Sequence, residues 1–415
     1  MAMTQFKPEG WNNQKNIIKV IGVGGGGTNA VNYMFSQDIK HVDFVVCNTD
    51  YQHLNESKVP VKLQLGPILT KGLGAGTDSL MGRKAATESI DEINKVLDGD
   101  TEMVFITCGM GGGTGTGAAP VIAEAAKARN LLTVGVVTIP PRHEGVETIH
   151  RANEGIRELS KHVDSLLIID NNLLYKVYAD LTIFEIFPKA DEILATAVRS
   201  IAEIITCRGV INVDFNDVRK VMKDSGQALM GRGVASGPNR VEDAVNMALK
   251  SPLLHDIDLS TTTKLLINIT SSDEKDKGIS GIEMIQIEEQ IAKETGPVIS
   301  SKTGLVKDPQ MEDSVSVTIV ATGFEMPPLP FVDEEEINKG NVVRIKYDQK
   351  LTVDKRDISS SAAESSTVTK RKRIIENPAL IVTNGADISQ MESEAAYYRR
   401  DRMLAEELKN TNTQE

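Results

Sequence analysis

A run of seven glycines and threonines at 111–117 limits the folds open to this chain more than any other feature. The apolar segment 103–108 comes directly before it, and a helical pattern at 120–129 follows it. Glycines weaken regular structure, so such a run indicates that backbone amides must approach something closely. A strand, a glycine-rich turn and a helix together predict an anion site, because a helix N-terminus favours negative charge.

A second glycine run, at 22–27, also follows a β-branched strand and precedes a helix. Two such turns at successive strand ends predict that one triphosphate is held from two sides. The second run also fits GxGxxG through Gly22, Gly24 and Gly27, with Asp50 further on, so a dinucleotide-dependent oxidoreductase is an alternative. That alternative leaves the first run unexplained. The P-loop pattern GxxxxGK[ST] is absent from the sequence, so a P-loop NTPase is excluded.

Apolar runs at 42–47, 132–139 and 165–169 alternate with helical patterns, among them one helix at 84–97. This alternation predicts an α/β fold with a Rossmann-like, mostly parallel sheet covered on both faces. A long helix with a wide apolar face follows. We expect a flexible segment at 1–15, the Rossmann-like domain at 16–188, the central helix at 189–208, a smaller α+β domain at 209–326 and a disordered linker and tail at 327–415.

The formal charge of −12 and pI of about 5.2 argue against a nucleic-acid partner, which needs a basic face. The three cysteines lack metal-ligand spacing, so we expect no protein-held metal site. The polar start lacks a signal-peptide core, and no apolar stretch reaches the ~20 residues of a membrane span. We therefore expect a cytoplasmic protein without direct membrane insertion.

The sequence around both glycine runs resembles the bacterial FtsZ family of the tubulin/FtsZ GTPase superfamily, in a somewhat divergent form. The resemblance spans about 19–324. It is carried by KVIGVGGGGTNAVN, NTDYQHL, TKGLGAGTD, VFITCGMGGGTGTGAAP, ELSKHVDSLLIID and GVASGPNR. It implies a GTPase that polymerises with GTP and forms the division ring in bacterial cytokinesis. By the same resemblance, domain 16–188 binds GTP or GDP, and domain 209–326 activates hydrolysis.

The resemblance also assigns nucleotide-binding residues. Those implied are Gly25, Gly26, Gly27, Thr28 and Asn29 for the phosphates and sugar side, Gly113, Thr114 and Gly115 for the β- and γ-phosphates, Glu144 for the ribose, and Phe187 and Asp191 for the base. An acidic acceptor facing N1–H and the exocyclic amine favours guanine over adenine. From the residues alone, Phe187 fits a core aromatic equally well, and Asp191 fits the charge of a helix N-terminus.

The resemblance further implies catalysis by a loop of pattern NxDxxD, formed here by Asn212, Asp214 and Asp217. In the family this loop reaches the nucleotide of the next subunit. Its carboxylates can polarise a water and help hold Mg²⁺ beside the γ-phosphate. Without the resemblance, Asp217 is more simply the N-terminal charge of the next helix.

Two positions depart from the family pattern. Where the family has PFxFEGxxR, this chain has PPRHEGVET, so that Thr148 occupies the arginine position and can donate a hydrogen bond without carrying charge. Arg142 and Arg151 are the two nearby candidates to replace that charge. Pro188 is also unusual beside the base-binding position. A filament scaffold that binds GTP but hydrolyses it weakly is therefore the alternative function.

The family assignment implies self-association as a head-to-tail polymer at mid-cell. It also implies that division proteins and membrane tethers bind the C-terminal tail. The family usually ends in a peptide similar to PAFLRR, and two weak candidates stand at 377–380 and 395–400. An uncommitted charged linker explains these segments equally well.

Overall fold

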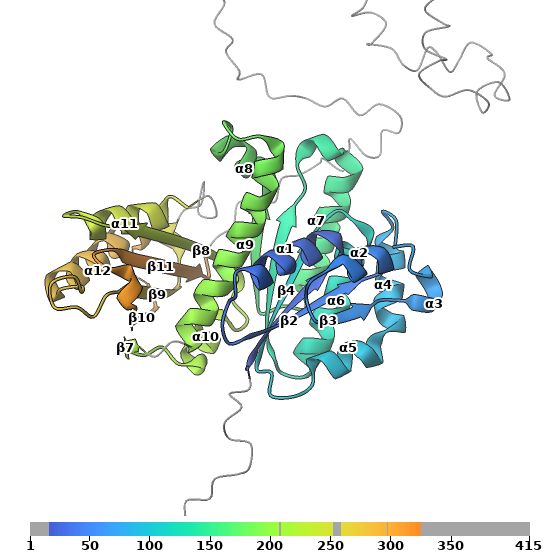
Figure 1. Ribbon diagram of the computed structural model, residues 1–415, viewed down its shortest axis with the longest axis horizontal. Coiled ribbons are helices and arrows are strands. Elements are labelled where there is room, and N and C mark those ends of the chain that lie inside the picture. Colours follow the sequence, from blue (N-terminus) through green and yellow to red (C-terminus); the bar gives the residue numbers. More distant parts are fainter. Residues whose placement is uncertain (1–15, 207–208, 252–258, 297, 325–415) are drawn as a thin grey trace, which may run out of the picture. The chain divides into compact units, whose positions relative to one another are not determined.

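The computed structural model describes residues 16–324, except 207–208, 252–258 and 297. The predictions for 1–15, for the tail and for its two partner-binding candidates lie outside these residues. The described strands form one hydrogen-bonded sheet of 11 strands. Helices lie on both sides of its first half (Figure 1), as the α/β prediction requires.

Six parallel strands form the first half of the sheet. In sheet order they are β3 (Val61–Gln64), β2 (Val42–Asn48), β1 (Ile18–Val23), β4 (Met103–Gly109), β5 (Leu132–Ile139) and β6 (Ser165–Asp170). Val23 pairs with Cys47 on one side and Cys108 on the other, so the strands end in line. Their carboxyl ends, and the turns that follow them, therefore share one edge of the sheet.

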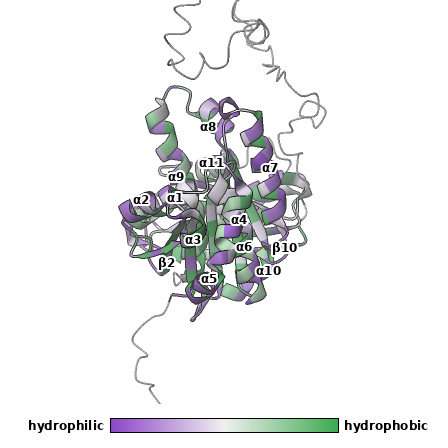
Figure 2. Cartoon of the chain, turned by 90° about the vertical axis from the view of Figure 1, so that its right-hand side faces the viewer, coloured by the Kyte–Doolittle hydropathy of each residue, from purple (hydrophilic) through white to green (hydrophobic). Residues whose placement is uncertain are grey.

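Two layers of helix cover this half, each with its own aliphatic core. On one face lie α1 (Gly24–Ser36), α9 (Ile183–Thr206) and α10 (Phe215–Met222). On the other face lie α4 (Ser79–Glu88), α5 (Ile90–Leu97), α6 (Gly113–Ala128) and α7 (Val146–Ser160). Shorter pieces are α2 (Tyr51–Glu56), α3 (Pro67–Thr70), α8 (Asn171–Val177) and the 3-10 turn η1 (Arg142–Glu144). Figure 2 shows hydrophilic residues along the exposed sides of α2 and α7.

The second half of the sheet is mixed and belongs to the smaller α+β region. Its strands are β8 (Gly226–Ala235), β11 (Val315–Thr322), β9 (Lys264–Ser271), β10 (Ser300–Lys307) and β7 (Gly209–Ile211). Its helices are α11 (Arg240–Leu249) and α12 (Gly281–Thr295), with 3-10 turns η2 (Leu259–Thr261) and η3 (Pro309–Met311). A separate core fills this region. Only two residue pairs, between β6 and β8, join the halves within the described sheet.

Two helix predictions differ from the structure. The single helix expected at 84–97 is two helices, α4 and α5, divided at Ser89. The hydroxyl of Ser89 accepts a hydrogen bond from the Gly66 amide at 2.9 Å, which ties the break to the chain before α4. The central helix begins at Ile183 rather than 189, because Thr182 and Glu185 cap it and Pro188 is accommodated inside. The division into domains at 188, 208 and 326 stays a prediction.

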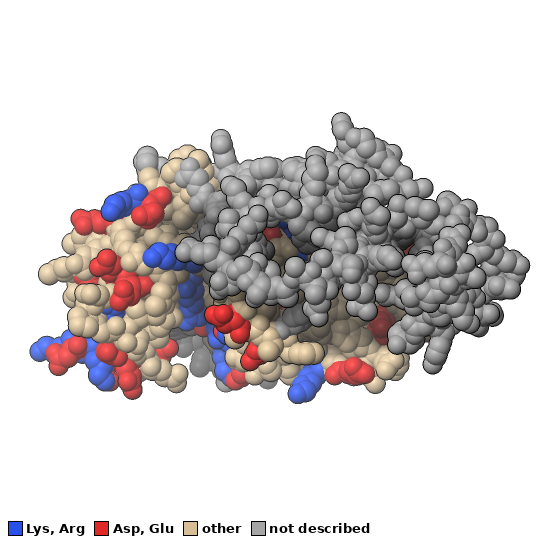
Figure 3. Space-filling view, turned by 90° about the horizontal axis from the view of Figure 1, so that it is seen from above, with Lys and Arg blue, Asp and Glu red and all other residues tan. Residues whose placement is uncertain are grey.

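Charged side chains of both signs are interspersed on the described part of the face drawn in Figure 3. Within the described residues, no helix combines the length and apolar character needed to cross a membrane.

Candidate nucleotide site and acidic loop

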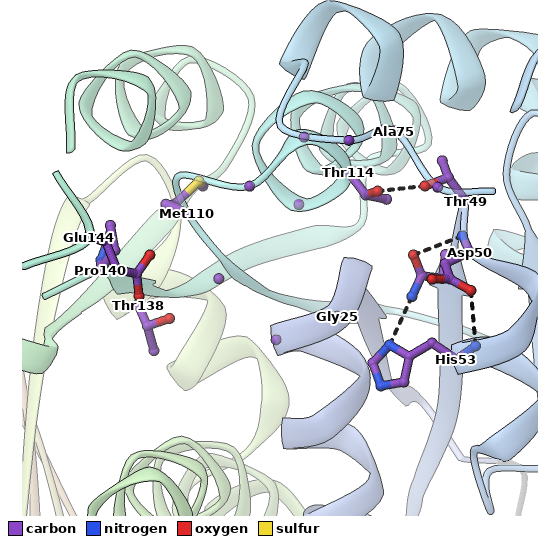
Figure 4. A pocket seen from close by; sticks show the side chains of 18 of the residues that line it. Gly25, Thr49, Asp50, His53, Ala75, Met110, Thr114, Thr138, Pro140 and Glu144 are labelled. Atoms are coloured by element: carbon purple, nitrogen blue, oxygen red, sulfur yellow. Dashed lines mark hydrogen bonds between the residues drawn. The ribbon is translucent and has the colours of Figure 1, made fainter. Parts of the chain in front are cut away.

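A cavity of about 510 Å³ opens at the carboxyl edge of the parallel strands (Figure 4). Both glycine runs contribute to its wall, as the sequence predicted. The residues that line it are Gly25, Gly26, Asn48, Thr49, Asp50, His53, Leu73, Gly74, Ala75, Gly76, Gly109, Met110, Gly112, Gly113, Thr114, Gly115, Thr138, Pro140, Glu144 and Asn171. Six of the predicted nucleotide-binding residues are thus brought together: Gly25, Gly26, Gly113, Thr114, Gly115 and Glu144.

Two helix N-termini converge on this cavity. Helix α1 begins at Gly24 and α6 begins at Gly113, and neither has a side-chain cap or an acidic residue in its first turn. Their first backbone amides have no partner within the helix and carry the positive end of the helix dipole. An anion with several oxygens can satisfy both sets of amides at once.

Both glycine turns are shorter than the sequence suggested, because each helix starts inside its glycine run. Glycine is required there by close packing of backbone on backbone. Gly24 has φ of +71°, and a Cβ on it would stand 2.9 Å from the amide nitrogen of Gly115. A Cβ on Gly117 would collide with the Ser79 carbonyl of α4. Part of the 111–117 run thus serves helix packing, and the remainder serves the cavity.

Polar side chains after β2 complete one wall, and the sequence analysis did not assign them to the site. Thr49 Oγ1 lies 2.6 Å from Thr114 Oγ1, which joins this wall to α6. Asn48 Oδ1 accepts the Asp50 amide at 3.2 Å, and Asn48 Nδ2 lies 3.2 Å from His53 Nδ1. Figure 4 shows the Thr49–Thr114 contact apart from Asp50 and His53, which lie nearer to Gly25. The signal was the Asn-Thr-Asp sequence at the end of a buried strand.

Asn171, at the start of α8, is a further wall residue that the sequence analysis missed. Its Oδ1 is buried and has no hydrogen-bond partner within the described residues. A buried acceptor without a partner is costly, so one beside a cavity indicates a ligand that supplies a donor.

The acidic loop lies away from this cavity. Asp214 caps α10 by accepting the Asp217 amide at 2.9 Å, and Asn212 Oδ1 accepts the Gly209 amide at 2.7 Å. Asp217 pairs with Lys302 Nζ of β10 at 2.8 Å, and this hydrogen bond lowers the pKa of Asp217. The helix that separates the loop from the cavity side, α9, has 24 residues. A helix of that length spans about 36 Å.

Comparison with known proteins then decides the family. The GTPase-domain model of the tubulin/FtsZ family matches residues 17–179, and the C-terminal-domain model of the FtsZ family matches 226–325. The cell division protein FtsZ of Azotobacter vinelandii is 50% identical over 312 residues, covering 75% of this chain and 78% of that protein. This chain belongs to the FtsZ family.

Other members of the FtsZ family are also similar to this chain. The FtsZ of Pseudomonas aeruginosa is 49% identical over 75% of this chain and 78% of its own. A solved FtsZ dimer from M. jannaschii superposes with a TM-score of 0.69 at 36% identity, covering 78% of this chain and 97% of that chain. As an FtsZ, the chain carries a GTPase domain that binds a guanine nucleotide. The oxidoreductase alternative is therefore wrong, and Gly22 has a packing role instead, directly against Gly27.

Three residues of α1 predicted to bind nucleotide in this FtsZ do not line the cavity. Gly27 is buried, and a Cβ there would collide with the Thr107 carbonyl, so its role is close packing of α1 on β4. Thr28 is also buried. Asn29 Oδ1 accepts a hydrogen bond from His53 Nε2 at 3.1 Å, so Asn29 acts on the cavity through that wall residue.

The two predicted base-binding residues also lie outside the cavity lining, on the first turns of α9. Phe187 is half exposed, and Asp191 follows it by four residues on the same helix face. Burial raises the pKa of Asp191 to about 6. Within the described residues, no hydrogen bond or ion pair to Asp191 offsets that burial. The half-buried carboxylate of Asp191 can therefore accept hydrogen bonds from the donor groups on the edge of a guanine base.

Thr148, at the arginine position of the family, also lies outside the lining. Its hydroxyl donates at 3.1 Å to the carbonyl of Glu144, the last residue of η1, and so joins the first turn of α7 to that 3-10 turn. It accepts a hydrogen bond at 3.2 Å from Arg151, one turn further along the helix. Arg142 is exposed.

Proposed function

We propose that this FtsZ hydrolyses GTP in a site shared by two subunits, as a GTP-dependent polymer of the bacterial division ring. The observation that carries this is the separation of the two halves of the site. The cavity presents backbone amides and polar side chains. The acidic residues of the loop follow the far end of α9, a helix of 24 residues. A subunit cannot bring Asp217 to its own cavity, but a head-to-tail neighbour can bring its copy there.

In this proposal the nucleotide is bound by residues of the cavity together with Phe187 and Asp191, which lie outside its lining on α9. The amides at the start of α1, from Gly25 and Gly26, and of α6, from Gly113 to Gly115, hold the phosphates. Glu144 accepts hydrogen bonds from the ribose. Phe187 stacks on the base, and the ionised carboxylate of Asp191 accepts from its N1–H and exocyclic amine. Guanine offers both donors and adenine does not, so the arrangement selects a guanine nucleotide.

Hydrolysis requires a water aligned with the γ-phosphate and neutralisation of the charge that develops there. The neighbour's Asp214 and Asp217 orient and polarise that water, and Asn212 holds the loop in shape. Mg²⁺ favours oxygen ligands, takes one or two carboxylates and shares phosphate oxygens. Asp50 on the cavity wall fits that donor set, together with the neighbour's carboxylates, and the ion would supply charge neutralisation. Assembly and turnover are thereby coupled, because a monomer lacks the second half.

The polymer is head to tail, since a cavity on one subunit and a loop on the next form a heterologous contact. We place it in the cytoplasm at mid-cell. Division proteins and membrane tethers bind through the tail beyond 327, which lies outside the described residues. Neither nucleic acid nor direct membrane insertion has a part in this function.

Sedimentation together with phosphate release, with GTP and Mg²⁺ over a range of protein concentrations, tests this function. Turnover per molecule should rise with concentration and level off once the protein sediments. Asp217→Ala should bind GTP nearly as wild type and lose turnover. Failure of that variant to bind GTP as a monomer would contradict the assignment in trans. The alternative, a weakly hydrolysing scaffold, is favoured by the uncharged Thr148, and it predicts polymers that persist long after GTP is added.

A further inference from the structure

The charged side chains that line the cavity are negative, and so is the nucleotide that it is proposed to bind. Among the described residues that line it there is no lysine or arginine, and two carboxylates, Asp50 and Glu144, are present. A nucleoside triphosphate brings several negative charges into this space. Helix dipoles contribute only about half a charge each. A cationic side chain behind the wall would therefore add to the charge neutralisation that Mg²⁺ is proposed to supply.

Arg151 of α7 is that cation. Its side chain is only 15% exposed. Its Nε donates to the Gly111 carbonyl at 3.0 Å, and a terminal nitrogen donates to Thr148 Oγ1 at 3.2 Å. The other terminal nitrogen pairs with Glu147 at 2.8 Å, but the Glu147 side chain is 89% exposed, so this ion pair contributes little. The contact with Gly111 is the one that links Arg151 to the cavity.

Gly111 is held from both sides. Its amide donates to Thr116 Oγ1 at 2.9 Å, and its carbonyl accepts from Arg151. Its φ of +100° is a conformation that favours glycine. The C=O and N–H of a trans peptide point in opposite directions. Because the Gly111 carbonyl faces Arg151, the Gly112 N–H of the same peptide unit faces away from it, on the side where Gly112 lines the cavity.

We propose that Arg151 is a positioning residue for the nucleotide phosphates, aiming the Gly112 N–H into the cavity and placing a positive charge behind that peptide. This rests on the proposed function and identifies which part of the nucleotide the residue serves. Arg142, the other arginine near the site, is exposed, and its guanidinium forms no hydrogen bond or ion pair with another described residue. Arg151 therefore supplies the charge that Thr148 lacks.

The test compares three full-length variants with wild type by equilibrium GTP and GDP binding, at protein concentrations too low for assembly. Arg151→Met keeps the apolar stem and removes donor and charge. It should weaken GTP binding by roughly tenfold, the effect of one charge-assisted hydrogen bond. Arg151→Lys keeps the charge and one donor, so it should recover most of the affinity. Arg142→Met, a matched loss of charge, should bind as wild type.

Thermal unfolding of the nucleotide-free variants separates positioning from stability. Unchanged GTP affinity in Arg151→Met, or affinity loss in Arg151→Lys equal to that in Arg151→Met, would overturn the proposal. So would a loss that appears in Arg142→Met instead. A wild-type protein that fails to bind GTP would contradict the proposed function itself, which distinguishes the two failures.

Discussion

The carboxylate of Asp217 lies 2.8 Å from the ammonium of Lys302, at the start of α10 and on β10 respectively. This pair fixes one acidic group of the loop and keeps it ionised, since the hydrogen bond from Lys302 lowers the pKa of Asp217. Asp217 is thus ionised at neutral pH, as its proposed role in polarising a water at the neighbouring subunit's cavity requires. The pair connects the smaller α+β region to the proposed chemistry of the neighbouring subunit.

Replacing Lys302 by an uncharged residue should change the pH dependence of turnover. In Lys302→Gln the pKa of Asp217 rises toward its ordinary value, so Asp217 protonates at a higher pH as the solution is acidified. The acidic limb of the kcat profile should move to higher pH. Lys307→Gln, on the same strand and paired with exposed Asp273, is the matched control. An unchanged limb in Lys302→Gln would show that Asp217 does not titrate in the rate-limiting step.

Guanine binding should weaken in acid. Burial raises the pKa of Asp191 to about 6, so the carboxylate is ionised at pH 7.5 and largely protonated at pH 5. Protonation removes one acceptor, and GTP affinity should fall by about tenfold as pH passes downward through that value. Asp191→Asn should bind GTP weakly without this pH dependence. Isothermal calorimetry of both proteins, with Asp180→Asn as control, measures the difference.

Ionisation of Asp191 should lower the stability of the fold, although it strengthens GTP binding. Since the folded protein raises the pKa of Asp191, the unfolded chain ionises first and stability is lost as pH rises from about 4 to about 6. Without nucleotide, Asp191→Asn should therefore be more stable than wild type at pH 8 and equal to it at pH 4. Equal melting temperatures at both pH values would contradict the burial of Asp191.

The hydroxyl pair that joins the two walls of the cavity should contribute to stability. Thr49→Val removes one member and leaves the buried Thr114 hydroxyl without its 2.6 Å partner. The free energy of unfolding should fall by about 1–3 kcal/mol. Thr87→Val, at an exposed position of α4, is the control, because the Thr87 hydroxyl donates to the Arg83 carbonyl one turn back. Urea unfolding of the three proteins gives the comparison.

Two thiols should be inert in the folded protein. Burial raises the pKa of Cys47 and of Cys108 to about 12, so neither is a thiolate at neutral pH. In a Cys207→Ser background, a thiol-specific reagent should label nothing rapidly until the protein is unfolded, when both should react. Fast labelling of the folded variant would show that the strand ends beside the cavity open readily.

Much of the first half of the fold was predictable because its strands are continuous β-branched runs, as at Ile18–Val23 and Leu132–Ile139. Strands β8 and β10 were missed, since GQALMGRGVA and SSKTGLVK are rich in glycine and polar residues. Their pairing with β11 and β9 stabilises them in place of local propensity. The start of α9 was missed because a proline ordinarily marks a helix boundary, whereas Pro188 lies inside this helix.

In the candidate site, too, some residues were predictable from the sequence and others were not. Glycine runs between strands and helices predicted the phosphate-binding edge, because that signal is local in sequence. Asn171 and His53 reach the cavity only through the alignment of strand ends, which no local pattern reports. The roles of Gly27 and Gly117 also depend on how closely α1 and α6 pack on their neighbours. Contacts of that kind are properties of the assembled sheet.

The shared site is tested most directly by mixing two inactive variants. Gly25→Val should block the cavity, because Gly25 lines it, a Cβ there would already contact the His53 ring at 3.6 Å, and valine adds two methyl groups at this position. Asp217→Ala keeps the cavity and loses the acidic group. In an equimolar mixture with GTP and Mg²⁺, half of the cavities belong to Asp217→Ala, and half of their neighbours carry an intact loop. Phosphate release should therefore return to about a quarter of the wild-type rate. A mixture no more active than the two variants measured separately would contradict hydrolysis between subunits.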